Sequence, residues 1–151
     1  MTTDNNPAAT RLYPDRPFVG VGVVVWRGDE FLLIQRGKEP RRGEWSLPGG
    51  MQETGETVFE AGAREILEET NLQISNLALV DVVDSVNRDA DGRVRTHYTL
   101  VDLVGAWADG EAVAGSDADG VGWFRLGDLT DLGLWSETNR IIRKSDEIRQ
   151  G

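Results

Sequence analysis

The stretch Gly50–Leu72, GMQETGETVFEAGAREILEETNL, decides how the rest of the chain is interpreted. Within it, residues 57–70 contain no proline, and Thr57 with Glu60 forms the S/T-x-x-E pattern of a capping box. A helical period of about 3.6 residues places four apolar side chains on one arc, those of Phe59, Ala63, Ile66 and Leu67. The sequence therefore predicts a helix over residues 57–70 that packs this apolar stripe on the core.

Three carboxylates share another face of this predicted helix, those of Glu65, Glu68 and Glu69. Like charges at this spacing destabilise a helix by roughly 0.2–0.5 kcal/mol, so an acidic face needs a reason. Hard divalent cations such as Mg²⁺ and Mn²⁺ prefer oxygen ligands. We therefore expect three unpaired carboxylates that converge on a metal ion. The alternative is a solvated acidic face in an acidic protein.

The residues around this acidic face favour the metal interpretation. Glu56 adds a fourth carboxylate just ahead of the helix, and Gly49–Gly50 and Gly55 mark backbone that can approach a ligand closely. Gly62 lies on the flank of the acidic face, although glycine costs a helix about 0.5–1 kcal/mol relative to alanine. We interpret Gly62 as a close backbone approach near the site, so that Gly62→Ala would keep the fold and disturb the site.

The spacing of these residues resembles the Nudix box, the signature of the Nudix hydrolases. The matching positions are Gly50, Glu56, Arg64-Glu65-Ile66, Glu68-Glu69 and Leu72, and the one departure is Asn71, where the family has glycine. Asparagine tolerates the left-handed conformation in which helices often end, so the departure changes little. The resemblance implies an α/β fold, a Nudix-type α/β/α sandwich with a mixed β-sheet between helices. It also implies Mg²⁺-dependent hydrolysis of a pyrophosphate bond in a nucleoside diphosphate derivative.

The resemblance further implies roles for individual residues. Mg²⁺ (or Mn²⁺) would be held by the carbonyl of Gly50 and by the carboxylates of Glu56, Glu65, Glu68 and Glu69. Glu68 or Glu69 would take the proton from the attacking water, with Glu56 as a less favoured alternative. Arg64 would orient Glu68 rather than touch the substrate.

A basic segment precedes the box. Residues 36–45, RGKEPRRGEW, carry the cations Arg36, Lys38, Arg41 and Arg42 in an otherwise acidic chain. Because the guanidinium fork suits phosphate oxygens, we expect Arg36, Arg41 and Arg42 to bind substrate phosphates, with a solvated loop as the alternative. Trp45 either stacks on a base or covers the core.

The substrate is indicated by two further segments. Residues 42–50, RGEWSLPGG, and residues 134–138, LWSET, resemble small bacterial Nudix proteins described as ADP-ribose pyrophosphatases. The proline that marks many ADP-ribose hydrolases is absent, since residues 85–88 read SVNR. We expect ADP-ribose or a related nucleotide sugar. The alternatives are a nucleoside triphosphate pyrophosphohydrolase acting on normal or oxidised nucleotides, and a Nudix module that senses a nucleotide without cleaving it.

The composition of the chain argues against several classes of protein. The chain has 151 residues, no cysteine and a net charge of −10, which argues against a nucleic acid polymer as partner. No apolar run approaches the roughly 20 residues of a membrane span, and the N-terminus lacks the features of a signal peptide, so we expect a cytoplasmic protein. We expect a flexible arm over residues 1–16, or an arm that packs on a partner subunit, and one Nudix hydrolase domain over 17–151. A homodimer is compatible with the sequence.

Other elements surround the helix. The pattern predicts a buried central strand over 18–26 that forms a hairpin with 31–35, a second hairpin of 77–86 with 94–104, and a short strand over 123–125. It also predicts a helical turn over 127–133 and a last helix that Ser136 caps, ending near Arg149, with Ile141, Ile142 and Ile148 inward. The polar strand residues Asp84 and Asp102 are expected to face solvent. The roles of His97, Asp117 and Asp119 stay open.

Overall fold

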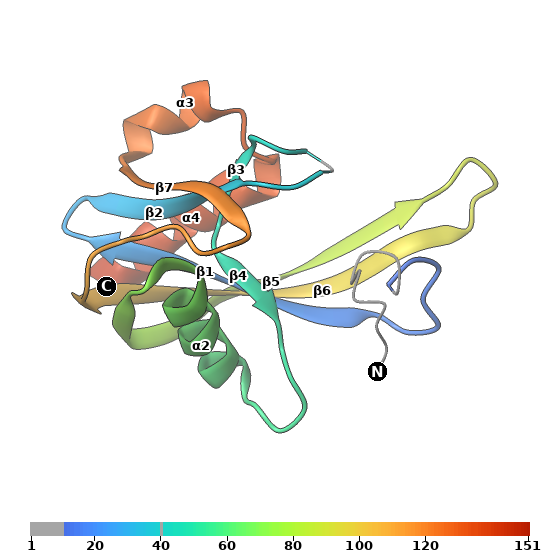
Figure 1. Ribbon diagram of the computed structural model, residues 1–151, viewed down its shortest axis with the longest axis horizontal. Helices are drawn as coiled ribbons and strands as arrows, with labels where there is room; N and C mark the ends of the chain where they lie inside the picture. Colours follow the sequence, from blue (N-terminus) through green and yellow to red (C-terminus); the bar gives the residue numbers. More distant parts are fainter. Residues whose placement is uncertain (1–10, 40) are drawn as a thin grey trace.

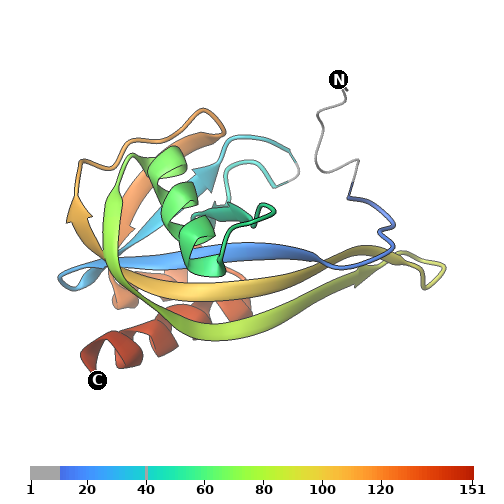
Figure 2. The same cartoon turned by 90° about the horizontal axis from the view of Figure 1, so that it is seen from below.

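The computed structural model describes residues 11–39 and 41–151 and contains a seven-stranded sheet (Figure 1). The sheet has the order β3-β2-β1-β6-β5, while β4 pairs with β1 and β7 with β2. The strands are β1 Phe18–Arg27, β2 Glu30–Arg36, β3 Trp45–Ser46, β4 Gly49–Met51, β5 Gln73–Arg88, β6 Val94–Asp109 and β7 Ala118–Phe124. Helix α2 (Val58–Thr70) covers one face and α4 (Ser136–Gln150) the other (Figure 2). The predicted α/β/α sandwich is therefore confirmed.

The strand β1 is the centre of the sheet, as the sequence predicts. It runs parallel to β6 and antiparallel to β2 and β4, so the sheet is mixed. Its side chains alternate between two core clusters. Val21, Val23 and Val25 pack with Ala61 and Ile66 of α2, whereas Val24 and Trp26 pack with Ile141 and Ile142 of α4. One strand thus supplies both layers of the core.

The predicted helix and its ends are confirmed. Thr57 accepts a hydrogen bond from the backbone N–H of Glu60, and the Glu60 carboxylate accepts one from the backbone N–H of Thr57. At the other end Asn71 is left-handed, with φ 64°, and donates its N–H to the carbonyl of Leu67. The departure from glycine at Asn71 therefore leaves the helix end intact.

The predicted apolar stripe of α2 is wrong in part. Phe59 is 42% exposed and Leu67 49% exposed, and the buried residues of the helix are Ala61, Gly62, Ile66 and Thr70. A Cβ on Gly62 would lie 3.0 Å from Cδ1 of Leu103 and 3.1 Å from Cγ2 of Val23. Gly62 is therefore present because the helix lies close on the sheet. Our interpretation of Gly62 as a backbone approach at the site was wrong.

The second hairpin is longer than predicted and projects beyond the body of the molecule (Figures 1 and 2). Tyr13 is attached to it, because its N–H donates to the carbonyl of Arg95 and its hydroxyl donates to Asp89. The guanidinium of Arg93 lies 4.2 Å from the Tyr13 ring centroid. Residues 1–10 of the predicted arm lie outside the described residues. The part at Tyr13 is held against the hairpin.

The C-terminal part contains a 3₁₀ turn (Leu126–Asp128), a short helix α3 (Leu129–Leu132) and α4. Ile141 and Ile142 are buried and Ile148 packs against the same core cluster, as predicted. Ser136 begins α4 but does not cap it, because Trp135 occupies the N-cap position and no side chain accepts a capping hydrogen bond. None of the helices in the described part of the chain is long and apolar enough to cross a membrane.

Candidate functional site

The side chain of Arg64 is the centre of the acidic face. Its Nε donates to Glu56 at 2.6 Å and its Nη2 to the other Glu56 oxygen at 3.0 Å. Its Nη1 donates to Glu65 at 2.8 Å and to Glu68 at 2.9 Å. These hydrogen bonds, that of Glu56 first, raise the pKa of Arg64. The expectation of unpaired carboxylates was therefore wrong for Glu65 and Glu68, because Arg64 projects from the same helix into their midst.

The fork of Arg64 holds Glu56 more fully than Glu68. Both Glu56 oxygens accept from Arg64, whereas Glu68 receives one hydrogen bond. The hydrogen bonds from Arg64 and then from the backbone N–H of Glu53 lower the pKa of Glu56. A carboxylate stabilised in its ionised form is a weaker proton acceptor. The low rank that the sequence interpretation assigned to Glu56 as a base stays a prediction.

Glu69 differs from the other carboxylates. It is partly buried, and its Oε1 accepts a hydrogen bond from the backbone N–H of Gly49 at 2.8 Å. Burial raises the pKa of Glu69 to about 7, the charges of Glu65, Asp117 and Glu68 raise it further, and the Gly49 bond opposes them. Glu69 thus connects α2 to strand β4.

The strand β4 lies directly against these carboxylates. A Cβ on Gly50 would lie 2.4 Å from the carboxyl carbon of Glu65, which is far inside van der Waals contact. Only glycine lets the backbone pass this close. Gly50 pairs with Val21 and Gly49 with Gly22, so the position of β4 is set by the central strand.

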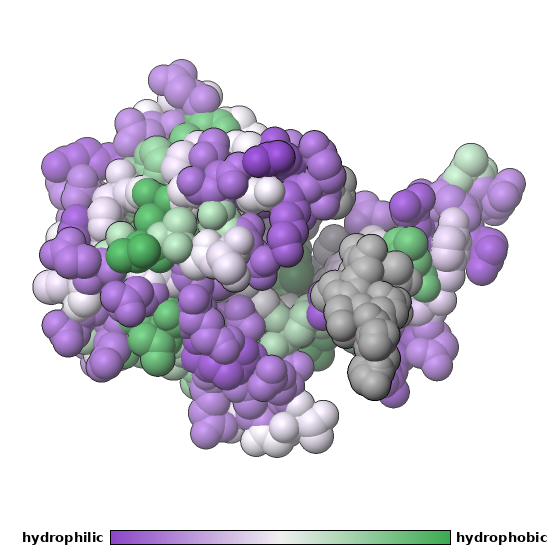
Figure 3. Space-filling view, in the orientation of Figure 1, coloured by the Kyte–Doolittle hydropathy of each residue, from purple (hydrophilic) through white to green (hydrophobic). Residues whose placement is uncertain are grey.

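The donor set suits a hard dication, although the side chains are turned to Arg64. Within residues 11–39 and 41–151, no three acidic or histidine side chains are arranged as a ready metal cage. The oxygens of three glutamates point instead at one guanidinium. Carboxylates nevertheless outnumber cations here, and the nearby donors are all oxygen atoms, the ligands that Mg²⁺ and Mn²⁺ prefer. Figure 3 shows a hydrophilic surface over α2 and the loop before it.

The basic segment lies beside the late acidic loop. Lys38 is 2.7 Å from Asp117, and Nε of Arg42 is 3.3 Å from Asp119. Both pairs are exposed, so each contributes little to stability. Asp117 and Asp119 therefore pair with the basic segment, and only Asp117 is near enough to act on Glu69 through its charge.

The other expected substrate residues occupy the same segment and the strand after it. Arg36 ends β2, where its N–H donates to the carbonyl of Glu44, and Arg41 has a left-handed backbone with φ 64°. Trp45 packs its ring against the edge of Phe124, with centroids 5.0 Å apart, and contacts the core cluster on the α4 side. The interpretation of Trp45 as a core cover is favoured. His97 lies on β6 opposite Val86, in the projecting hairpin.

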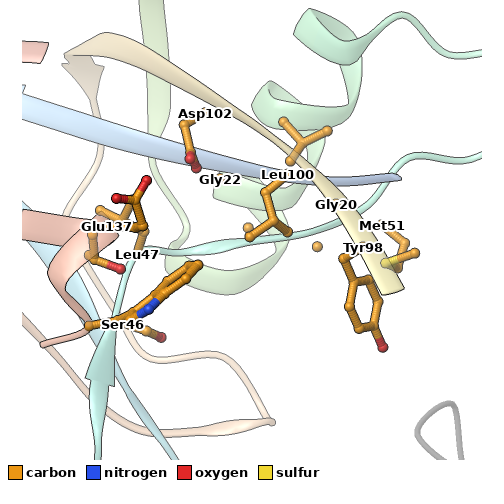
Figure 4. A pocket seen from close by; sticks show the side chains of 14 residues that line it. Gly20, Gly22, Ser46, Leu47, Met51, Tyr98, Leu100, Asp102 and Glu137 are labelled. Carbon is orange, nitrogen blue, oxygen red and sulfur yellow. The ribbon is translucent and has the colours of Figure 1, made fainter. Parts of the chain in front are cut away.

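A pocket of about 330 Å³ lies on the other side of β4, and the sequence interpretation missed it. It opens between β1, β4, β6 and the start of α4 (Figure 4). Its lining residues are Gly20, Val21, Gly22, Ser46, Leu47, Gly49, Gly50, Met51, Tyr98, Leu100, Asp102, Trp135, Glu137 and Thr138. Gly20 and Gly22 lie on one face of β1, and this pair of glycines was a sequence signal that could have revealed the pocket.

The prediction that Asp102 faces solvent was wrong. Asp102 is 8% exposed and lines this pocket. Burial raises its pKa to about 6, an effect that the charges of Asp81 and Glu137 increase and that of Arg140 opposes. The strand pattern could not reveal this burial, because α4 packs over this face of β6 from the far end of the sequence.

Comparisons with known proteins agree with this geometry. The family model described as NUDIX domain matches residues 16–144. The chain is 40% identical over 122 residues to the ADP-ribose pyrophosphatase of Methanocaldococcus jannaschii, covering 81% of this chain and 69% of that protein. It is 39% identical over 87 residues to the 8-oxo-dGDP phosphatase of Mus musculus, covering 54% of this chain and 27% of that protein. A MutT NUDIX hydrolase from Burkholderia pseudomallei superposes with a TM-score of 0.75 at 31% identity, covering 86% of this chain and 98% of that chain.

The match to the family model begins just before β1 and ends within α4. It therefore includes both core clusters and both faces of β4, and is not confined to the short motif around Arg64. The chain belongs to the Nudix family, and it is a hydrolase that acts on pyrophosphate bonds.

Proposed function

We propose that this protein hydrolyses the pyrophosphate bond of ADP-ribose or a related nucleotide sugar with the help of Mg²⁺ (or Mn²⁺). The observation that carries the proposal is the position of β4. Its backbone at Gly49 and Gly50 touches the carboxylates on one side and lines the pocket on the other. A substrate with a phosphate chain and an attached organic group can therefore reach both. The similarity to the Methanocaldococcus jannaschii ADP-ribose pyrophosphatase supports the choice of substrate.

The residues around Arg64 have distinct tasks in this proposal. Glu65, Glu68, Glu69 and the carbonyl of Gly50 would hold the metal ion, with Glu56 as a further ligand. When bound, Mg²⁺ supplies charge neutralisation for phosphate oxygens and a water molecule of lowered pKa. Arg64 holds Glu56, Glu65 and Glu68 in position through its hydrogen bonds and would orient them for the metal ion.

Proton transfer falls to the acids at the end of the helix. Glu69 would take the proton from the attacking water, and Glu68 is the alternative base. Glu56 is held ionised by Arg64 and is less suited. Arg36, Arg41 and Arg42 would attract the phosphates locally in a chain with net charge −10, and Trp45 would support this rim from the core side.

A second candidate substrate is an oxidised or normal nucleotide. The similarity to the Mus musculus 8-oxo-dGDP phosphatase favours it, and that alignment includes about half of this chain. A module that senses nucleotides without cleavage is less favoured, because Glu56, Glu65, Glu68 and Glu69 are all present.

The test is incubation of the protein with Mg²⁺ and, in separate reactions, ADP-ribose, 8-oxo-dGDP and a nucleoside triphosphate. AMP plus ribose 5-phosphate supports the proposal, and pyrophosphate released from the triphosphate supports the alternative. Product that forms in excess EDTA contradicts a metal-dependent reaction. Absence of product from every substrate would favour the sensing module.

A further inference from the structure

The carboxylate of Asp102 has no partner in the part of the chain that the structure describes. It is 8% exposed, and no hydrogen bond or ion pair joins it to residues 11–39 or 41–151. Two cations on α4 lie on this side of the sheet, but Asp81 binds both, with Arg140 at 3.0 Å and Lys144 at 3.3 Å. Asp102 is thus a largely buried acid whose carboxylate lines the pocket and receives no hydrogen bond from the described residues.

A structural role does not account for this acid. A buried polar group without a hydrogen bond destabilises a protein, and a buried charge destabilises it more. A residue in the middle of β6, between Val101 and Leu103, would stabilise the fold better if it were apolar. A largely buried acid that has no protein partner and lines a pocket is typical of a site that meets a ligand.

The shape of the pocket indicates what the ligand is like. A Cβ on Gly22 would lie 2.8 Å from Oδ1 of Asp102, and a Cβ on Gly20 would lie 3.0 Å from Cδ2 of Leu100. These glycines leave the β1 side of the pocket without side chains, as Figure 4 shows. Tyr98, Leu100 and Leu47 supply further apolar surface, and Trp135 stands half exposed at α4. The cavity favours a flat, mostly apolar ring.

The cavity contains two carboxylates, which differ in their hydrogen bonds, and the hydroxyls of Ser46, Tyr98 and Thr138. Glu137 also lines it, but its carboxylate already accepts hydrogen bonds from Arg140. Figure 4 shows Asp102 extending from β6 and Glu137 from α4 toward the same space. Of the two carboxylates, Asp102 is therefore the one that remains available to a ligand ring.

We propose that this pocket holds the purine base of the substrate and that Asp102 selects a base with an exocyclic amino group by accepting its N–H. The proposal rests on the proposed function, since it places the base beyond β4 from the carboxylates that would hold the metal. Adenine offers such an amino group at position 6. Hypoxanthine has a carbonyl oxygen there, which a carboxylate repels. A site built around one buried acceptor rejects an analogue that lacks the donor.

The test compares AMP and IMP, which differ at position 6 of the base. Their binding to the full chain in Mg²⁺ is measured by isothermal titration calorimetry. We expect AMP to bind at least about tenfold more tightly than IMP. In Asp102→Leu the affinity for AMP falls and the AMP/IMP ratio drops to about 1. In Asp102→Asn the ratio shrinks less, because an amide oxygen still accepts from the amino group.

The matched control is Asp84→Asn, which removes an exposed acid from the neighbouring strand and should leave the ratio unchanged. Thermal melting at pH 7 checks folding, and both Asp102 variants should melt no lower than the parent chain. A structural role for Asp102 predicts the opposite, a lower melting temperature with an unchanged AMP/IMP ratio. That result, or equal binding of AMP and IMP by the parent chain, overturns the proposal, as does a failure of AMP to bind.

The failure of this inference is distinguishable from failure of the proposed function. Hydrolysis of ADP-ribose by a protein that binds AMP and IMP equally leaves the function intact and removes the role of Asp102. Selective binding of AMP without hydrolysis of ADP-ribose retains the role of Asp102 and removes the proposed substrate.

Discussion

Two acidic regions lie on opposite sides of β4, and the protein treats them differently. On the α2 side, Glu56, Glu65 and Glu68 share the guanidinium of Arg64. On the α4 side, Asp102 is buried with its nearest cations engaged by Asp81 and Glu137. In the first region Arg64 is the counterion of the glutamates. In the second region the carboxylate of Asp102 receives no hydrogen bond from the described residues. In our proposals the first region binds a cation and the second accepts from a neutral donor, and the difference teaches that these two tasks need opposite surroundings.

The largest effect is expected from Glu69→Gln. This change removes the buried carboxylate that links α2 to Gly49, and kcat/KM should fall by about 10²–10⁴-fold. In EDTA the variant should unfold at the same temperature as the parent chain or higher, because burial and like charges disfavour the ionised acid. Steady-state hydrolysis of ADP-ribose and thermal melting measure the two effects. Glu147→Gln on the exposed side of α4 is the control, and parental activity of Glu69→Gln would remove the acid from the mechanism.

The next effect concerns stability and pH at Asp102. Its pKa is about 6 in the folded protein against an ordinary value of 3.8, so the native state binds the proton more tightly than the unfolded chain. Stability contributed by the protonated acid is therefore present below about pH 4 and is lost as the pH rises to about 6. Asp102→Asn should raise the free energy of unfolding by about 2–3 kcal/mol at pH 7 and by almost nothing at pH 4.

Urea unfolding at the two pH values measures this difference, with Asp84→Asn as the exposed control. An Asp102→Asn variant that is less stable than the parent chain at pH 7 would mean that the carboxylate has a partner after all. The contrast between the two acidic regions would then be lost.

A smaller effect is expected from Arg64→Lys. An ammonium group cannot hold both oxygens of Glu56 and reach Glu65 and Glu68 with a planar fork, so the carboxylates lose their orientation. We expect kcat/KM to fall by about 10–100-fold, mainly through kcat. Arg149→Lys, which changes another arginine paired to an acid, should leave kcat near the parental value. A change in KM alone would indicate that Arg64 touches the substrate.

The smallest effect is expected at the basic segment. The exposed pair of Arg42 with Asp119 should contribute at most about 0.5 kcal/mol, so Arg42→Gln should melt like the parent chain. If Arg42 binds substrate phosphates, KM should rise by about 2–5-fold, and the rise should diminish in high salt. Kinetics at two salt concentrations separate this role from a solvated loop. Asp119→Asn serves as the partner control.

The parts of the molecule that the sequence predicted correctly depend on local chemistry. The capping box of Thr57 and Glu60 and the left-handed Asn71 bound α2 through contacts within a few residues. Strand β1 was recognisable because its run of apolar residues has side chains for both faces of the sheet. The acidic face was recognisable from helical spacing, although its pairing with Arg64 depends on the turn of the guanidinium back toward β4 and Met51.

The parts that were missed depend on contacts between distant segments. Phe59 and Leu67 looked like core residues, but the helix packs through Ala61 and Gly62, which bring it closer to β1 and β6. Asp102 alternates with apolar neighbours as an exposed strand residue would. Its burial follows from the packing of α4, some 35 residues later in the chain, and no local pattern reports such a contact.

The pairing of Gly50 with Val21 has a consequence for how the substrate range of this enzyme could change. The distance between the pocket and the carboxylates of α2 is set by the main-chain register of β4 against β1. Replacement of one side chain does not alter this register. With the base placed in the pocket as we propose, replacement of Asp102 or Trp135 would change the ring systems that the pocket accepts. The distance from the ring to the pyrophosphate bond would stay the same. Proteins that evolve from this chain should therefore change the ring that the pocket accepts first. The number of atoms between that ring and the hydrolysed bond should change later.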